Sequence, residues 1–143
     1  MFRTKKRAKE IEHICKLSLI RKSTKIYKNK LYIDNEIVYV ETIKIKNKLQ
    51  IINELAPIHN WINNRVYLLE RTNNISTHMF KSAVDIIVCD IRFNVLETHR
   101  NVLKNSNIKC HEKAFNIWIA KVGFIDFYNI KENGYIALKA YSL

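Results

Sequence analysis

The chain has 143 residues, of which 48% are hydrophobic and 27% are charged, which is the balance of a single globular domain. With two Gly and one Pro, the composition excludes collagen-like and low-complexity chains. Its three Cys include no Cys-x-x-Cys pair, which argues against a disulfide framework and fits a reducing cytoplasm. No apolar run approaches the roughly 20 residues that span a bilayer. We therefore predict a cytoplasmic protein without a transmembrane segment.

The formal net charge is +12, and most of it lies near the N-terminus. Residues 1–30 carry eleven Lys or Arg and two Glu, a net charge of +9. Residues 31–143 carry fourteen basic and eleven acidic residues, a net charge of +3. This asymmetry predicts a basic N-terminal extension over 1–30 and a single β-rich domain over 31–143. Part of the Lys excess also fits the composition of an AT-rich genome.

Residues 4–20 are predicted to form a basic amphipathic helix, because Ala8, Ile11, Cys15 and Leu19 recur at helical spacing. Clustered Lys and Arg on such a helix can neutralise phosphates or contact anionic lipid. The extension therefore predicts contact with nucleic acid or an anionic membrane surface, and the alternative is a charged face that contacts only water. The candidate contact residues are Arg3, Lys5, Lys6, Arg7, Lys9, Arg21 and Lys22.

The rest of the chain is predicted to be mostly strands. Two short strands flank the turn residues Asp34 and Asn35, and apolar residues at helical spacing over 47–55 predict the main helix. The other expected strands cover 65–70, 84–90, 95–100, 114–120 and the C-terminal end, with polar loops at 71–77 and 101–112 and a short helical turn before the last strand.

Many short strands with one substantial helix indicate an α+β fold that is predominantly β. We expect a compact, barrel-like antiparallel or mixed sheet with one main helix, to which the basic N-terminal helix is appended. The run VDIIVCD at 84–90 is almost continuously apolar, and it predicts a strand that is buried on both faces.

The stretch ISTHMFKSAVDIIVCD at 75–90 holds the candidate site residues Thr77, His78, Asp85 and Asp90. Two interpretations are open. Thr77 and Asp85 satisfy backbone groups where the loop enters the strand, or the loop faces a ligand. Successive side chains on a strand point to opposite faces, so these groups do not converge as metal ligands do. We therefore predict no metal site.

A catalytic nucleophile would have to be Ser76 or Cys89, with His78, His99 or His111 as its base. The chain has no Gly-x-Ser-x-Gly turn and no Gly-rich phosphate loop. Cys89 lies in an apolar run, where a thiol is usually a buried small hydrophobe. We therefore predict no catalytic residue.

Several positions over about residues 38–138 keep a recognisable spacing: Thr77 follows Ile75 by two residues, and Asp85 follows Thr77 by eight. This spacing resembles the uncharacterised prokaryotic family catalogued as domain of unknown function number 192. The resemblance implies a compact β-rich domain with no established activity and no cofactor. The matching positions are Ile75, Thr77, Val84, Asp85, Ile86, Ile87, Asp90, Val95, Gly123 and Gly134.

Three functions remain after these considerations. The leading hypothesis is a small non-enzymatic accessory or interaction domain that binds an unknown protein partner. The alternative is a nucleic-acid-binding protein that uses the basic N-terminal segment. The weaker alternative is a metal-dependent or hydrolase-like enzyme centred on Thr77, His78, Asp85 and Asp90.

Overall fold

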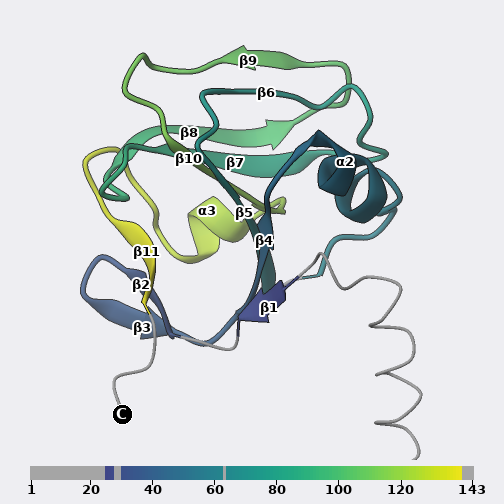
Figure 1. Ribbon diagram of the computed structural model, residues 1–143. Coiled ribbons are helices and arrows are strands. Elements are labelled where there is room, and N and C mark those ends of the chain that lie inside the picture. Colours follow the sequence, from purple (N-terminus) through teal and green to yellow (C-terminus); the bar gives the residue numbers. More distant parts are fainter. Residues whose placement is uncertain (1–24, 28–29, 63, 140–143) are drawn as a thin grey trace, which may run out of the picture.

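The computed structural model describes residues 25–27, 30–62 and 64–139, which form a β-rich fold with short helices (Figure 1). The described strands belong to three sheets of six, three and two strands. This confirms the predicted α+β class with β structure dominant. The predicted helix over 4–20 lies outside the described residues. No helix in the described part of the chain is long and apolar enough to cross a membrane.

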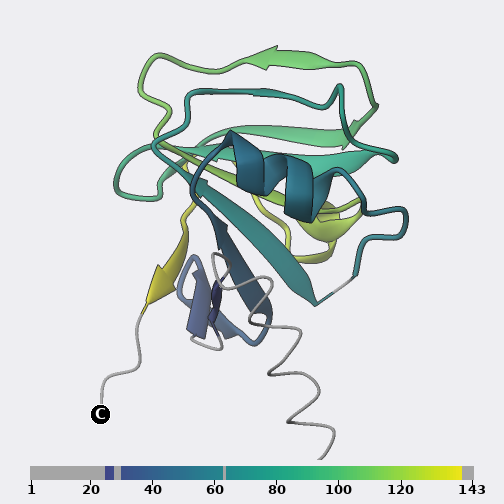
Figure 2. The same cartoon turned by 45° about the vertical axis from the view of Figure 1, so that its right-hand side comes forward.

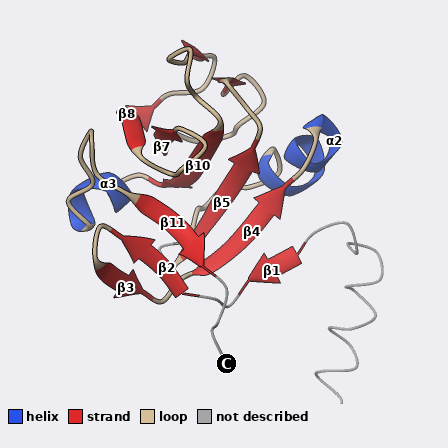
Figure 3. Cartoon of the chain, turned by 60° about the vertical axis from the view of Figure 1, so that its left-hand side comes forward, coloured by secondary structure: helices blue, strands red, loops and turns tan. Residues whose placement is uncertain are grey.

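The large sheet has the strand order β1, β4, β5, β10, β7 and β8. All neighbouring strands are antiparallel except β4 and β5, which are parallel (Figure 3). Parallel neighbours need a long crossover connection, and the helix predicted over 47–55 lies in it. The bounds are β1 Lys25–Tyr27, β4 Glu41–Ile45, β5 Arg65–Glu70, β7 Val84–Cys89, β8 Val95–Val102, β10 Asn116–Lys121, α2 Lys48–Gln50 and the π-helical turn η1 Ile51–Leu55.

The two smaller sheets flank the large one. The first has the order β11, β2, β3, and the second pairs β6 with β9. The helical turn α3 follows β10. The bounds are β2 Lys30–Ile33, β3 Glu36–Val38, β6 Asn74–Ser76, β9 Asn107–Lys109, α3 Phe124–Phe127 and β11 Ile136–Lys139.

The prediction of a barrel-like sheet is wrong. Among the described residues, the start of β8 meets the segment that leads into β11 through backbone hydrogen bonds of Phe93 and Val95, and the pairing there is an isolated bridge between Asn94 and Tyr135. An isolated bridge is not a continuous strand ladder, so the described strands form three sheets rather than a closed barrel.

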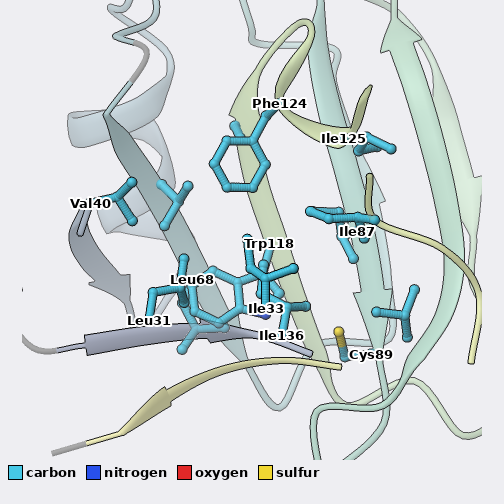
Figure 4. Packing of buried hydrophobic residues seen from close by; sticks show 14 residues of the cluster. Leu31, Ile33, Val40, Leu68, Ile87, Cys89, Trp118, Phe124, Ile125 and Ile136 are labelled. Atoms are coloured by element: carbon cyan, nitrogen blue, oxygen red, sulfur yellow. The ribbon is translucent and has the colours of Figure 1, made fainter. Parts of the chain in front are cut away.

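Each face of the large sheet has its own hydrophobic core. On β5, Leu68 packs in one core and Leu69 in the other, because successive side chains point to opposite faces. The first core lies against α3 and the three-stranded sheet, with Trp118 at its centre (Figure 4). The second lies under α2, η1 and β6 (Figure 2). All six residues of β7 are buried, which confirms the prediction of a strand buried on both faces.

Some elements do not follow from the sequence patterns. The short strands β6 and β9 lie in segments that were predicted to be polar loops. Each strand has a single apolar residue, Ile75 in β6 and Ile108 in β9, and these two residues pair with each other. Three residues with one apolar side chain are too few to show a period of two. The strand β1 pairs with β4, so residues 25–27 contribute to the large sheet although they fall within the predicted extension over 1–30.

Candidate functional site

Thr77 lies directly after β6 and is fully buried. Its hydroxyl oxygen Oγ1 donates to the backbone oxygen of Leu103 at 2.6 Å and accepts from the backbone N–H of Ser106 at 2.9 Å. Its own N–H donates to the Ser106 oxygen at 2.9 Å. Thr77 therefore closes the loop between β8 and β9 onto the end of β6.

Asp85 is the second residue of β7, and only 1% of it is exposed. Its Oδ1 atom accepts from the Asn101 N–H at 2.9 Å, and its Oδ2 atom accepts from the N–H groups of Gly123 and Ile125, both at 3.0 Å. One carboxyl group thus joins β7 to β8 and to the start of α3. Gly123 has a φ of 102°, a left-handed conformation that a side chain would strain.

A β-bulge explains why Asp85 is needed. Val84 pairs with Val102 and Ile86 pairs with His99, so β8 has one extra residue opposite Asp85. A bulge leaves the extra residue without a partner in the ladder, and the backbone at Asn101 has a φ of 51°. The Asp85 carboxyl group accepts the hydrogen bond of the Asn101 N–H in place of a ladder partner.

Asp90 organises the hairpin loop between β7 and β8. Its Oδ1 atom accepts from the N–H groups of Arg92 and Asn94, both at 2.9 Å, and its Oδ2 atom accepts from the Asn94 side-chain amide at 3.2 Å. Desolvation alone would raise the pKa of Asp90, but the hydrogen bonds from Asn94 and Arg92 outweigh it and hold the pKa below its ordinary value. Asp90 is a turn residue in this arrangement.

We expect the loss of stability in an Asp90→Ala variant to depend on pH. Because the folded-state pKa of Asp90 is lowered, its contribution is present above the unfolded pKa of about 4 and is lost as the pH falls through the folded value. The difference in unfolding free energy between the parent and Asp90→Ala should be constant above about pH 5 and shrink below about pH 4. Urea denaturation over a pH series measures it. A difference that grows on acidification would contradict the role of the ionised turn residue.

The four candidate residues do not converge on one point of the structure. Thr77 and Asp85 bond to opposite ends of the segment 101–106, whereas Asp90 lies in a hairpin loop. His78 is exposed, and its N–H donates to the Ser76 hydroxyl at 3.2 Å. In the part of the chain that the structure describes, no three His, Cys, Asp or Glu residues are placed to hold a metal ion.

Among the described residues, no hydrogen bond joins the Ser76 hydroxyl or the Cys89 thiol to a histidine ring, and the Ser76 hydroxyl accepts from the backbone N–H of His78. Cys89 is fully buried, and burial raises the pKa of its thiol far above the ordinary value, with a further contribution from the charge of Asp90. Cys110, which was not a predicted nucleophile, is half-buried, and burial together with the charge of Glu97 raises its pKa to about 11. His99 bonds to Glu97 at 2.8 Å. A thiol is nucleophilic as the thiolate, which these positions disfavour.

Alkylation should therefore distinguish the folded protein from the unfolded one. At pH 8 we expect iodoacetamide to modify Cys110 on the order of a hundred times more slowly than a free thiol, because little thiolate is present. Cys89 should react only after unfolding. Mass spectrometry of the peptides that hold each residue measures the rates, and the same protein in urea is the control. Rapid labelling of Cys89 in the folded protein would restore the nucleophile hypothesis.

Sequence reasoning missed a concave surface of the described residues. A groove of about 990 Å³ lies where the parallel strands β4 and β5 end, between η1 and β6. Its apolar lining includes Ile52, Met79 and Ile91, of whose surfaces 43%, 47% and 63% are exposed. The remaining lining residues are Ile45, Lys46, Asn47, Ile51, Leu69, Glu70, Arg71, Thr72, Asn73, Asn74, Ile75, Ser76 and Phe115.

The groove has no motif that a sequence pattern would reveal. Its residues come from β4, η1, β5, β6 and five connections between elements, which are spread over residues 45–115. The sequence feature that lies in the groove is the run 71–76, RTNNIS, where polar residues surround a single apolar residue. The basic residues proposed for phosphate or anionic surfaces, Arg3, Lys5, Lys6, Arg7, Lys9, Arg21 and Lys22, lie outside the described residues.

The fold and the site together define a class of protein. It is a β-rich domain in which Thr77, Asp85 and Asp90 bond to the backbone, with an outward-facing groove that is lined by apolar and polar residues. The sequence matches no protein-family model and no curated protein. Two solved bacterial structures share the fold.

The first similar structure is described as a putative transcription regulator from Sinorhizobium meliloti 1021. It has a TM-score of 0.67 and 9% sequence identity, and the match covers 79% of this chain and 95% of that one. The second is a protein of unknown function from Novosphingobium aromaticivorans DSM 12444. It has a TM-score of 0.68 and 9% identity, and the match covers 78% of this chain and 84% of that one. At this identity the likeness concerns the fold alone.

Proposed function

We propose that this chain is a non-enzymatic interaction domain that binds another protein, and that it belongs with the uncharacterised prokaryotic family of domain of unknown function number 192. The family proposal is supported by the bonding of its spaced positions. Asp85 accepts a hydrogen bond from the backbone of Gly123, and both are positions of that resemblance. Thr77 and Asp85 bond to the same segment 101–106.

The interaction function rests on the exposed apolar side chains around the groove. Ile52, Met79 and Ile91 stand at its surface, and contiguous exposed apolar patches on soluble domains often mark binding sites. Of the four candidate residues, Thr77, Asp85 and Asp90 bond to backbone groups. The geometry therefore supports binding better than catalysis.

Reconstitution tests the interaction function. A partner that copurifies with the tagged full chain from its native cell should form a complex again when both proteins are purified separately. Ile91→Asp should weaken this complex at least about tenfold, because it places a charge on the apolar surface. Phe127→Asp is the matched control, because Phe127 is 79% exposed but does not line the groove. Failure to reconstitute any complex from purified components would refute the proposal.

Nucleic-acid binding through the basic segment is the second proposal, and the charge asymmetry favours it. Residues 1–30 carry +9 of the net +12, and one protein of similar fold is described as a putative transcription regulator. Replacing Lys5, Lys6, Arg7 and Lys9 together by Gln in the full chain should weaken binding to duplex DNA and flatten its dependence on salt.

Salt titration of DNA binding by fluorescence anisotropy measures the effect. A deletion of residues 1–24 is the second variant, because it leaves the strand β1 and its pairing with β4 intact. DNA affinity that survives both changes would exclude the segment as the binding surface. If the chain binds anionic vesicles and not DNA, the basic segment contacts a membrane surface instead of nucleic acid.

A further inference from the structure

We propose that the groove binds an extended, acidic segment of a partner protein, which adds a strand to the open edge of β6. This inference rests on the proposed interaction function and names where and how the partner binds. Three features of the described residues carry it: a free strand edge, apolar residues in the groove lining beside it, and two cations without ion-pair partners.

The strand edge follows from the hydrogen-bond register. Thr77 lies opposite Ser106 in the continued register of β6 and β9, and the Thr77 N–H donates to the Ser106 oxygen. In an antiparallel ladder, hydrogen-bonded and non-hydrogen-bonded pairs alternate, so Ile75 forms the next bonded pair. The backbone groups of Asn74 and Ser76 therefore point away from β9. No described strand pairs with this edge.

Apolar residues line the groove beside that edge. Asn74 and Ser76 line the groove, and η1 contributes Ile51 and Ile52 to the opposite wall. An added strand places alternate side chains on one face, where they would contact such a surface. The volume of about 990 Å³ falls at the upper end of the range for ligand sites.

The charge of the groove selects an acidic partner. Lys46 and Arg71 line it, and neither has an ion-pair partner among the described residues. The acidic lining residue Glu70 is paired with Lys44 at 3.6 Å. The uncompensated charge is therefore positive, which favours a carboxylate and disfavours a basic segment such as residues 1–30.

Arg71 offers a variant that should not impair folding. Its φ of 55° places it in the left-handed region, where a residue with a long side chain is strained and Asn is tolerated. Arg71→Asn therefore removes the charge while relieving the backbone. Any loss of binding in this variant reflects the missing guanidinium rather than an unfolded protein.

Proline substitution tests the strand edge with a matched control. Asn74 and Lys109 lie opposite each other in the register, and both direct their backbone groups outward. Asn74→Pro removes an N–H on the groove side, whereas Lys109→Pro removes one on the far side of the pair. Circular dichroism and thermal unfolding confirm that both variants fold.

The probe is a displayed library of random dodecapeptides selected on the full chain. We expect enrichment of peptides with alternating apolar residues and at least one Asp or Glu. A synthetic peptide from this selection should bind Arg71→Asn and Asn74→Pro at least about tenfold more weakly than the parent, and Lys109→Pro equally well. The affinity for Arg71→Asn should also depend less on salt.

Several outcomes overturn the proposal. They are a selection without enrichment, an enrichment of peptides without acidic residues, and unchanged binding by Asn74→Pro. Decanoate is the comparison ligand: if it binds in the groove and depends on Arg71 while the peptides do not bind, the site takes an anionic amphiphile. If a reconstituted protein partner binds both variants as tightly as the parent, the interaction function stands and only this assignment of the groove fails.

Discussion

Asp85→Ala should lower the free energy of unfolding by about 3–5 kcal/mol, a large fraction of the stability of a small domain. The carboxyl group accepts hydrogen bonds from the N–H groups of Asn101, Gly123 and Ile125, and 1% of the residue is exposed. Alanine would leave three donors without their acceptor, and a buried donor without a partner costs about 1–3 kcal/mol. Urea denaturation followed by circular dichroism measures the loss.

Two variants make this expectation specific. Asp85→Asn keeps one acceptor oxygen and should lose about half as much stability as alanine. Asp126→Ala removes an acidic residue whose side chain is 69% exposed and paired with Arg100, so it should change stability by less than about 1 kcal/mol. If Asp85→Ala is as stable as the parent and loses a binding or catalytic activity, the carboxyl group acts on a ligand and not on the backbone.

Thr77→Val should lower the free energy of unfolding by about 2–4 kcal/mol. Valine has nearly the shape of threonine, so the variant creates no cavity and isolates the hydroxyl. Without it, the N–H of Ser106 loses an acceptor and the carbonyl of Leu103 loses a donor, both next to a fully buried side chain. The loop between β8 and β9 should also exchange its amide hydrogens faster than in the parent.

Thr77→Ser is the control for this prediction. It keeps the hydroxyl and removes a methyl group, so it should cost about 1 kcal/mol through lost burial and leave the amide exchange of the loop near that of the parent. A Thr77→Val variant that is as stable as the parent, beside a clearly destabilised Thr77→Ser, would show that the methyl group, rather than the hydrogen bonds, holds the loop. Hydrogen exchange measured by mass spectrometry separates these outcomes.

Strands with a strong pattern of apolar residues were predictable, because the pattern that indicates their burial lies in consecutive residues. The strand β7 was expected to be buried on both faces, and every residue in it is buried. Alternation predicted β10, and turn residues predicted the pair β2 and β3. The helix over 47–55 was expected from its apolar spacing, but the structure forms it as α2 and the π-helical turn η1.

For the candidate site, the sequence left two roles open, in which the side chains either satisfy backbone groups or face a ligand. The sequence placed Thr77 and Asp85 at the entry to a buried strand, where their short polar side chains can satisfy backbone groups. Their partners could not be foreseen, because Leu103 is 26 residues from Thr77 and Ile125 is 40 residues from Asp85. The bulge at Asn101, which creates the need for the Asp85 carboxyl group, arises from the pairing of β7 with β8.

The amino-acid pattern by itself determined the β-rich class, the doubly buried strand and the concentration of charge in residues 1–30, because these depend on composition and on neighbours along the chain. Only the tertiary structure decided that the strands form three sheets, that β4 and β5 are parallel, and that a groove lies where they end. Strand pairing joins distant segments. The edge of β6 and the charge of Arg71, both without a partner among the described residues, therefore lie on one surface only after folding.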